Sequence, residues 1–358
     1  MSKKLVGPIL LIVIIGAVFI LSQRTPEGPI ENNELDEPNV PDDPEAPEEP
    51  PVAPEEPTET PVDELEGIMR GVSLSPASFE SEEFLGFFQL ASDSGDFVSW
   101  VGDVASLTSE QSPTKVMYAM ADQYGFEVMV ITGYFNQESG EVFHELDETN
   151  RQDIINALVG YVEEHNPEYL GFGVEVNAFA RSNPEGYADY LSYYADVYDA
   201  VKEANPYTKV FPVFQLEHMK GLDGGLFGGE NDPDANTWTM LDDYEFDLAV
   251  FTTYPCLIFK DPSDIPADYF SEIADYTEKP IAFTEMGWLR DGFTGWESSV
   301  EEQAEFIETF FDLTEDIEVE FVTWSFLYDQ NAQAPFDQMG LMAVGEETSI
   351  AYEAWKMR

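Results

Sequence analysis

The chain has 358 residues, of which 72 are Asp or Glu and only 15 are Lys or Arg, so its formal net charge is −57. An excess of this size repels nucleic acid and anionic polysaccharides, and neither is expected as a partner. The single cysteine, Cys256, excludes an intrachain disulfide framework, and with only three histidines no metal or cofactor is expected.

The first 24 residues are predicted to be a membrane signal rather than part of the fold. Residues 5–22 carry no charge and are mostly Leu, Ile and Val, which is just long enough to span a bilayer. Lys3 and Lys4 favour an inside amino terminus, so the rest of the chain is expected outside. We predict a single-pass signal anchor in the cell membrane; a cleaved signal peptide and a secreted protein are the alternative.

Residues 25–65 are rich in Pro and Glu and are predicted to be an extended, disordered linker. The part that follows, 66–358, has the size of a single α/β barrel. From residue 67 onward it holds 12 of the 15 basic and 56 of the 72 acidic residues. Such acidity is typical of a saline habitat, where salt screens the repulsion between carboxylates.

The folded part repeats a short apolar run, a polar loop and a longer amphipathic stretch. Strands are predicted at 68–73, 97–101, 127–132, 169–175, 209–215, 246–254, 280–285 and 319–325. Helices are predicted at 112–124, 150–165, 184–204, 264–276, 300–313 and 349–356. Eight strands that alternate with helices indicate a parallel sheet. We expect a closed (β/α)8 TIM barrel, with an open doubly wound sheet as the alternative.

The active site of such a barrel lies at the carboxyl ends of its strands. Each predicted strand ends in polar or aromatic side chains, which suit a neutral sugar, although aromatic rings could also simply fill the barrel mouth. The candidates are Ser73, Ser75, Trp100, Asp103, Tyr134, Asn136, Glu175, Asn177, Gln215, Glu217, His218, Tyr254, Glu285, Trp288, Trp324 and Tyr328.

Two of the predicted strands end in a glutamate, at Glu175 and at Glu285. A carboxyl group at the end of a buried strand has low-dielectric surroundings, which perturb its pKa. Two such groups are what glycoside hydrolysis requires, because one protonates the leaving oxygen and the other attacks, or activates water, at the anomeric carbon. For either glutamate alone, an ordinary surface position is the alternative.

From about residue 70 to its end, the chain resembles a glycoside hydrolase of clan A. It is most similar to the endo-β-1,4-galactanase type, in which a Gly-Asn-Glu-x-Asn signature closes strand four. Gly173–Asn177 is similar to that signature, with Val174 in place of its first Asn, and Thr284–Trp288 is similar to the strand that carries the nucleophile.

The resemblance implies that Glu175 is the acid/base and Glu285 the nucleophile. It also implies that Tyr254 contacts the nucleophile and that Trp324 floors a sugar subsite. The predicted substrate-binding residues are Asn177, Tyr254, Trp324, Trp288, Gln215, Glu217, His218, Asn136 and Tyr134.

These residues predict an extracellular, retaining glycoside hydrolase that acts as a monomer on a β-linked neutral or basic polysaccharide. The alternative is a barrel that binds carbohydrate at the cell surface without cleaving it. Glu230–Asp234 is rich in the oxygen ligands that Ca²⁺ prefers, but it lacks the EF-hand spacing. A solvated acidic loop is therefore the default interpretation of 221–235.

Overall fold

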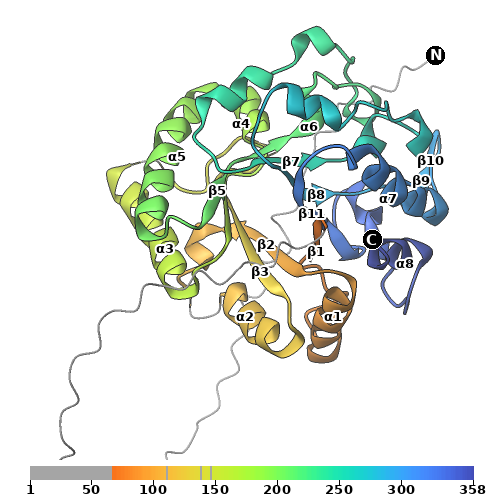
Figure 1. Ribbon diagram of the computed structural model, residues 1–358, viewed down its shortest axis with the longest axis horizontal. Helices are drawn as coiled ribbons and strands as arrows, with labels where there is room; N and C mark the ends of the chain where they lie inside the picture. Colours follow the sequence, from red (N-terminus) through yellow and green to blue (C-terminus); the bar gives the residue numbers. More distant parts are fainter. Residues whose placement is uncertain (1–66, 110–111, 138, 146) are drawn as a thin grey trace, which may run out of the picture. The chain divides into compact units, whose positions relative to one another are not determined.

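A closed ring of parallel strands forms the centre of the computed structural model (Figure 1), which describes residues 67–109, 112–137, 139–145 and 147–358. The ring consists of β1 (Met69–Ser73), β2 (Phe97–Asp103), β3 (Glu127–Gly133), β4 (Tyr169–Phe172), β5 (Lys209–Phe211), β6 (Val213–Gln215), β7 (Ala249–Thr253), β8 (Ile281–Met286) and β11 (Val319–Trp324). Their order in the sheet is β5-β4-β3-β2-β1-β11-β8-β7-β6.

β5 and β6 are two halves of the fifth predicted strand, separated by Pro212. Proline cannot donate a hydrogen bond to a neighbouring strand, so it interrupts the ladder. β5 pairs with β4, and β6 pairs with β7, so this one divided strand closes the ring between its two neighbours. The predicted (β/α)8 barrel is confirmed, and the open sheet was the wrong alternative.

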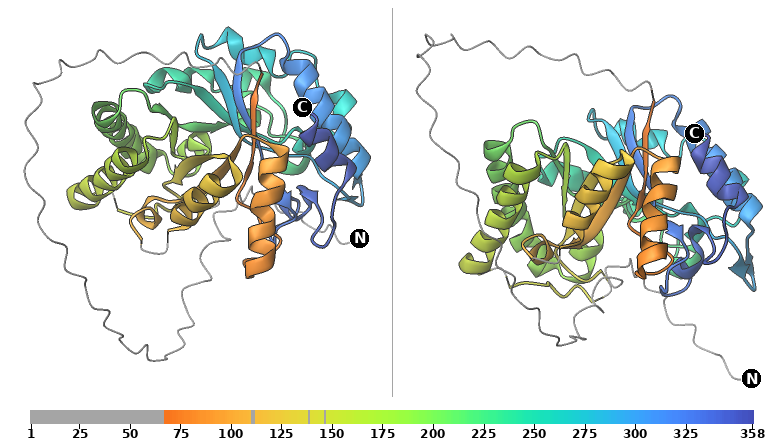
Figure 2. Two further views of the ribbon diagram at one scale, coloured as in Figure 1. Left: turned by 60° about the horizontal axis from the view of Figure 1, so that its bottom comes forward. Right: turned by 90° about the horizontal axis from the view of Figure 1, so that it is seen from below.

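Helices surround the strands on the outside (Figure 2). The α-helices are α1 (Ser81–Ser94), α2 (Pro113–Tyr124), α3 (Glu148–His165), α4 (Val176–Ser182), α5 (Pro184–Ala204), α6 (Leu216–Met219), α7 (Val300–Thr314) and α8 (Ile350–Lys356). Local sequence explains several of their ends. The Asp147 side chain accepts from two backbone N–H groups at the start of α3, and Gly125 ends α2 with a φ of 79°.

Apolar side chains pack on both faces of the barrel strands. One set fills the interior of the barrel, and a larger set lies between the strands and the helices. This explains why the strands read as nearly continuous apolar runs. The buried interior set is Phe97, Met129, Ile131, Tyr169, Val174, Phe211, Val213, Leu248, Val250, Ala282 and Phe321.

The predicted helix at 264–276 is wrong. That segment contains 3-10 turns, η7 (Pro262–Asp264) and η8 (Ser271–Asp275), and Pro266 between them cannot donate the hydrogen bond that a continuous α-helix needs. The helices α1, α4 and α6 were not predicted. The other 3-10 turns are η2 (Val104–Ser106), η3 (Gly225–Phe227), η4 (Pro233–Ala235), η5 (Trp238–Asp243), η6 (Pro255–Leu257) and η9 (Phe336–Gln338).

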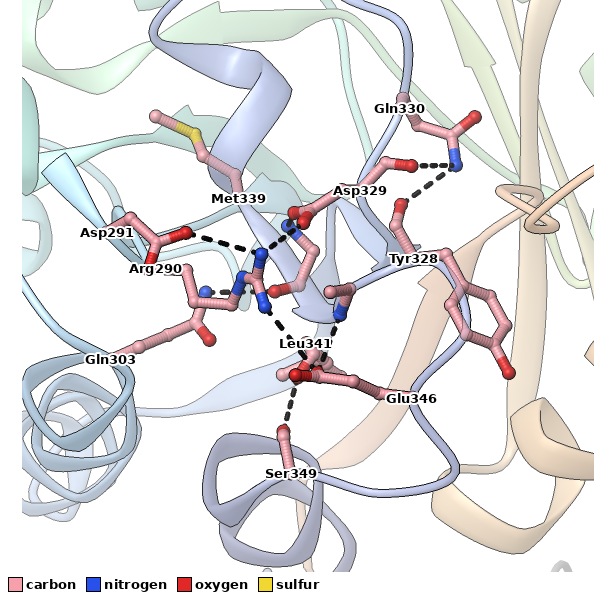
Figure 3. A network of polar contacts seen from close by, with 12 residues as sticks. Arg290, Asp291, Gln303, Tyr328, Asp329, Gln330, Met339, Leu341, Glu346 and Ser349 are labelled. Carbon is pink, nitrogen blue, oxygen red and sulfur yellow. Dashed lines mark hydrogen bonds and ion pairs between the residues drawn. The ribbon is translucent and has the colours of Figure 1, made fainter.

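Short strand pairs extend two loops at the carboxyl ends of the barrel strands. They are the antiparallel pair β9 (Gly292–Phe293) with β10 (Trp296–Glu297), and the parallel pair β12 (Phe326–Tyr328) with β13 (Gly340–Met342). Figure 3 shows how Arg290, after β8, lies among three carboxylates. Its guanidinium is 2.7 Å from Asp329 Oδ2, 3.3 Å from Asp291 Oδ2 and 3.5 Å from Glu346 Oε2. These ion pairs connect the loop after β8 to the loops around β12 and β13.

The predicted membrane anchor at 5–22 and the predicted linker at 25–65 lie outside the described residues. Within the part of the chain that the structure describes, no helix combines the length and the apolar character needed to cross a membrane.

Candidate active site

A β-bulge in β8 turns the Glu285 side chain towards the inside of the barrel. Phe283 pairs with Phe251 of β7, but Thr252 then pairs with Glu285, so Thr284 is an extra residue. The register of β8 with β11 shifts in the same place. Without the extra residue, alternation of side chains along the strand would put residue 285 on the outer face.

Glu175 lies beyond the end of β4, immediately before α4. Its φ of 55° is in the left-handed region, which residues with a side chain adopt rarely and mostly at special sites. The side chain is fully buried, and Thr252 Oγ1 donates to its Oε1 at 2.8 Å. Its Oε2 has no hydrogen-bond partner among the described residues. A buried oxygen without a partner fits a group that acts on a bound molecule.

Thr252 contacts both glutamates but only one carboxyl group: its hydroxyl donates to Glu175, and its backbone is the strand partner of Glu285. Burial, and after it the charge of Glu285, raises the pKa of Glu175 well above its ordinary value. Burial also raises the pKa of Glu285, to about 7, against the opposing hydrogen bond from Tyr254. Of the two carboxyl groups, Glu175 is the one whose pKa is also raised by the charge of the other.

Tyr254, directly after β7, is fully buried and contacts Glu285 as expected. Its hydroxyl donates to Glu285 Oε2 at 2.7 Å and lies 2.8 Å from Ser325 Oγ. The Ser325 hydroxyl in turn donates to the Met286 carbonyl at 2.9 Å. The phenol is thus fixed from two sides, and it stabilises the ionised form of Glu285.

Three further predicted site residues bind one another in the wall of the site. Asn177 Oδ1 accepts from the Gln215 N–H, and Asn177 Nδ2 donates to the Gln215 carbonyl, both at 2.9 Å. Gln215 Nε2 donates to Glu217 Oε2 at 2.6 Å. All three side chains are buried. Their polar atoms are engaged within the protein, so this structure gives them no free group for a sugar hydroxyl.

Three aromatic residues predicted to bind sugar lie on the outer side of the barrel. The rings of Trp324 and Trp288 pack 6.1 and 5.1 Å from Phe306 of α7. Tyr134 packs 5.4 Å from Tyr190 of α5. All three are buried, with 1% exposure or less. The prediction rested on their positions near strand ends, but these side chains face the helices, and a platform for sugar at the barrel mouth is not supported.

The last two predicted residues differ in their surroundings. His218 Nε2 lies 3.3 Å from Asp223 Oδ1, which also accepts from Arg181 at 2.8 Å. Burial, followed by the charge of Arg181, lowers the pKa of His218 to about 4 against the effect of Asp223, so the imidazole is neutral at pH 7. Asn136 is exposed, and its Oδ1 accepts from the Ser139 N–H and hydroxyl of its own turn.

Thr252 and Ser325 were missed by the sequence analysis, although both contact the candidate catalytic groups. Thr252 lies two positions before Tyr254, and Ser325 directly follows Trp324; both Tyr254 and Trp324 were predicted site residues. Period-two alternation from Tyr254 and from Thr323 indicates the inward side of these strands, and it could have found both residues.

Neither candidate carboxylate is widely open to solvent. Glu175 has no exposed surface, and 5% of Glu285 is exposed. A cavity of about 720 Å³ lies at the opposite end of the barrel, where Tyr244, Glu245 and Tyr276 precede β7 and β8. That cavity is separate from the two carboxylates.

The acidic loop at 221–235 uses several of its oxygens within the loop. Asn231 Oδ1 accepts from the Gly224 N–H at 2.7 Å, and Asp232 Oδ1 accepts from the Asp234 N–H at 3.1 Å. Across the described ranges, no three His, Cys, Asp or Glu side chains are grouped so that they could hold a metal ion.

The chain is a (β/α)8 barrel with two buried glutamates near the carboxyl ends of its strands, and the solved structures that it resembles include glycoside hydrolases of clan A. The GH5_18 protein from Streptomyces cattleya, in complex with Manb1-4GlcNAc, matches with a TM-score of 0.58 at 13% identity, over 81% of this chain and 80% of that one. Xylanase 10B from Thermotoga maritima matches with a TM-score of 0.55 at 13% identity, over 81% and 94%.

A family 39 glycoside hydrolase from Bacteroides cellulosilyticus WH2 matches with a TM-score of 0.55 at 17% identity, over 80% of this chain and 62% of that one. This chain spans half of a GH2 beta-galacturonidase from Eisenbergiella tayi that also matches. Identities at this level show a common fold alone. No protein-family model matches the chain, and no curated protein matches it in sequence.

Proposed function

We propose that this protein is a retaining glycoside hydrolase, with Glu175 as acid/base and Glu285 as nucleophile. The observation that carries the proposal is the difference between the surroundings of the two buried carboxyl groups. Tyr254 stabilises the ionised form of Glu285, whereas Glu175 is fully buried with one oxygen unpartnered. An acid with the higher pKa and a nucleophile with the lower one are what retaining hydrolysis requires.

In the first step, Glu285 attacks the anomeric carbon while Glu175 gives its proton to the leaving oxygen. The glycosidic bond breaks, and a glycosyl ester forms on Glu285. Tyr254 occupies Glu285 Oε2, which leaves Oε1 for the attack, and Thr252 holds Glu175 Oε1, which leaves Oε2 to carry the proton. In the second step, ionised Glu175 takes a proton from water, and the resulting hydroxide releases the sugar from the ester.

The charge of the site supports a neutral or basic β-linked substrate. Glu175, Glu217 and Glu285 are all buried, and within the described part of the chain no Lys or Arg is among the causes that shift their pKa values. An anionic sugar would add to this uncompensated negative charge. The similarity of Gly173–Asn177 to the galactanase signature makes β-1,4-galactan the first substrate to test.

In this proposed function the barrel lies outside the cell. In it, residues 5–22 act as the membrane anchor and the acidic linker at 25–65 spaces the enzyme from the bilayer, or the protein is secreted if the signal is cleaved. The enzyme acts as a monomer without a cofactor.

A non-catalytic barrel that binds carbohydrate is the second candidate. The limited exposure of the two glutamates and the position of Val174 favour it, because Val174 lies in the apolar interior where the galactanase signature has a polar Asn. Binding without cleavage predicts retention of sugar polymers and no new reducing ends.

Hydrolysis by matched variants distinguishes these two functions. Galactan, mannan, glucan, xylan and chitosan are tested first, then an aryl β-glycoside of the active sugar. Glu285→Gln is expected to lose activity by about 10⁴-fold or more on all of them, because no nucleophile remains. Glu175→Ala is expected to keep activity on the aryl glycoside, whose leaving group needs no proton, and azide should accelerate it.

Glu278→Gln is the control, because it makes the same chemical change at an exposed position before β8. It is expected to hydrolyse like the wild type. Equal residual activity of the Glu285 and Glu175 variants on the aryl glycoside, or binding of polymers without hydrolysis by the wild type, would contradict the proposal.

A further inference from the structure

Glu217, which the sequence suggested as a sugar ligand, has an unusual set of four hydrogen-bond donors. Its Oε1 accepts from Thr253 Oγ1 at 2.9 Å, from the Tyr254 N–H at 2.8 Å and from the Tyr269 hydroxyl at 2.8 Å. Its Oε2 accepts from Gln215 Nε2 at 2.6 Å. The side chain has no exposed surface. Both oxygens are therefore occupied, and none is left for a substrate.

The orientation of these contacts is fixed by the neighbouring atoms. Gln215 Oε1 accepts from the His218 N–H at 2.6 Å, so its Nε2 must be the atom that faces Glu217. The Tyr254 backbone N–H can only donate as well. Each oxygen of Glu217 thus faces at least one group that can only donate a hydrogen bond. These surroundings suit an ionised carboxylate, which only accepts hydrogen bonds.

These contacts form an unbroken chain between the two halves of the candidate site. Asn177, two residues after Glu175, holds both backbone groups of Gln215, and Gln215 binds Glu217. Glu217 then holds the backbone of Tyr254, whose hydroxyl donates to the proposed nucleophile. The predicted sugar ligands Asn177, Gln215 and Glu217 are therefore better explained as parts of one support.

We propose that Glu217 is a positioning residue, which fixes Tyr254 so that its phenol donates to Glu285 Oε2. This inference rests on the proposed function of Glu285. Among the described residues, the titratable groups that interact with Glu217, Tyr254 or Glu285 include Glu175, Tyr269 and Cys256. Of these, Tyr269 binds Glu217 directly, and Glu175 interacts with both Glu285 and Tyr254.

Glu217→Gln is the test, because it preserves shape and replaces one oxygen by an amide NH₂. In either orientation the new NH₂ faces another donor, the Gln215 amide or the Tyr254 N–H. The repulsion between the two donors is expected to shift the Tyr254 backbone, and the phenol moves with it. The hydrogen bond that favours ionised Glu285 is then weakened, and the pKa of Glu285 rises by about one unit. The acid limb of kcat/KM moves to higher pH, and kcat falls about 10- to 100-fold with little change in KM.

Asp247→Asn is the matched control. Asp247 is a partly buried carboxylate that also accepts from a backbone N–H, that of Val210, and from a tyrosine hydroxyl, that of Tyr198. It differs from Glu217 in that it also pairs with Lys202, at 3.1 Å. It precedes β7 and therefore lies at the other end of the barrel. This variant is expected to lose stability without any movement of the acid limb. Tyr254→Phe by itself should also move the acid limb of kcat/KM to higher pH. Adding Glu217→Gln to Tyr254→Phe should cause no further movement.

A measurement without substrate separates this inference from the proposed function. Infrared titration of the carboxyl band, assigned by its loss in Glu285→Gln, gives the midpoint of Glu285 even if no glycoside is cleaved. An upward shift in Glu217→Gln but not in Asp247→Asn supports positioning. An unchanged midpoint in folded Glu217→Gln, or a raised KM with an unmoved acid limb, would overturn it.

Discussion

Glu175 and Glu285 carry the same carboxyl group, but the protein surrounds the two groups differently. Glu285 receives a phenol hydrogen bond from Tyr254, while Glu175 receives one from the hydroxyl of Thr252 and keeps one buried oxygen without a partner. Both groups are raised in pKa by burial, and Glu175 is raised further by the charge of its neighbour. The surroundings, more than the residue type, thus assign the two roles.

The pH profile of hydrolysis follows from this difference. Glu285 must be ionised to attack, so kcat/KM is expected to rise with pH through about 7, its pKa. Glu175 must keep its proton, so activity falls again at higher pH, where this carboxyl ionises. Initial rates on an aryl glycoside with a poor leaving group, measured from pH 5 upwards, test the rise and the fall that follows it. Maximum activity below pH 5 would contradict these assignments.

Glu175→Gln has a predictable effect on stability as well. The folded pKa of Glu175 lies above its ordinary value of 4.5, so the stability that this carboxyl contributes is present below pH 4.5 and is lost as pH rises towards the folded pKa. Glutamine does not ionise. The variant should melt like the wild type at pH 4.5 and about 2 °C or more above it at pH 8. A difference that does not change with pH would show that Glu175 ionises normally.

Among the elements, β8 shows most clearly what the sequence could and could not reveal. Its apolar run and terminal glutamate could be predicted, but the bulge at Thr284 could not, because a bulge depends on register with β7 and β11. The same limit explains Trp324. Its position at the end of β11 was predicted correctly, but the side of the strand on which its ring lies could not be predicted without the pleat of the strand. In 264–276, one proline, Pro266, outweighed an amphipathic pattern.

The ion pairs of Arg290 are predicted to stabilise the loops at the carboxyl end of the barrel. Burial raises the pKa of Asp329 to about 6, against the opposing effect of Arg290. Arg290→Met leaves this carboxylate without its cation, which should lower the free energy of unfolding by about 3 kcal/mol at pH 8. The loss should be smaller at pH 5, where Asp329 is protonated.

Denaturant unfolding at both pH values measures the effect of Arg290→Met. Arg181→Met is the control, because its guanidinium is half exposed and pairs with one carboxylate, so its removal should matter by about 0.5 kcal/mol or less. Equal losses in the two variants would mean that the lower exposure of Arg290, 15% against 51% for Arg181, has no special effect.

For the whole molecule, the dominant physical feature is negative charge. From residue 67 onward, 56 acidic residues face only 12 basic ones, so most carboxylates lack a cationic partner. The Debye length falls from about 30 Å at 0.01 M salt to about 3 Å at 1 M. We therefore predict that the melting temperature keeps rising with NaCl well beyond about 0.15 M. The comparison is with an uncharged osmolyte, and a melting temperature that is flat or falls with salt would contradict an adaptation to brine.

The most direct test of the two-carboxylate mechanism is the identity of the residue that becomes glycosylated. Wild-type protein and Glu175→Ala are incubated with activated 2-deoxy-2-fluoro β-glycosides of galactose, mannose, glucose and xylose, and peptides are mapped by mass spectrometry. We predict that one sugar is attached to Glu285 in both proteins and that Glu285→Gln carries none. Attachment to another residue, or hydrolysis of these sugars with inversion and no attached sugar, would contradict it.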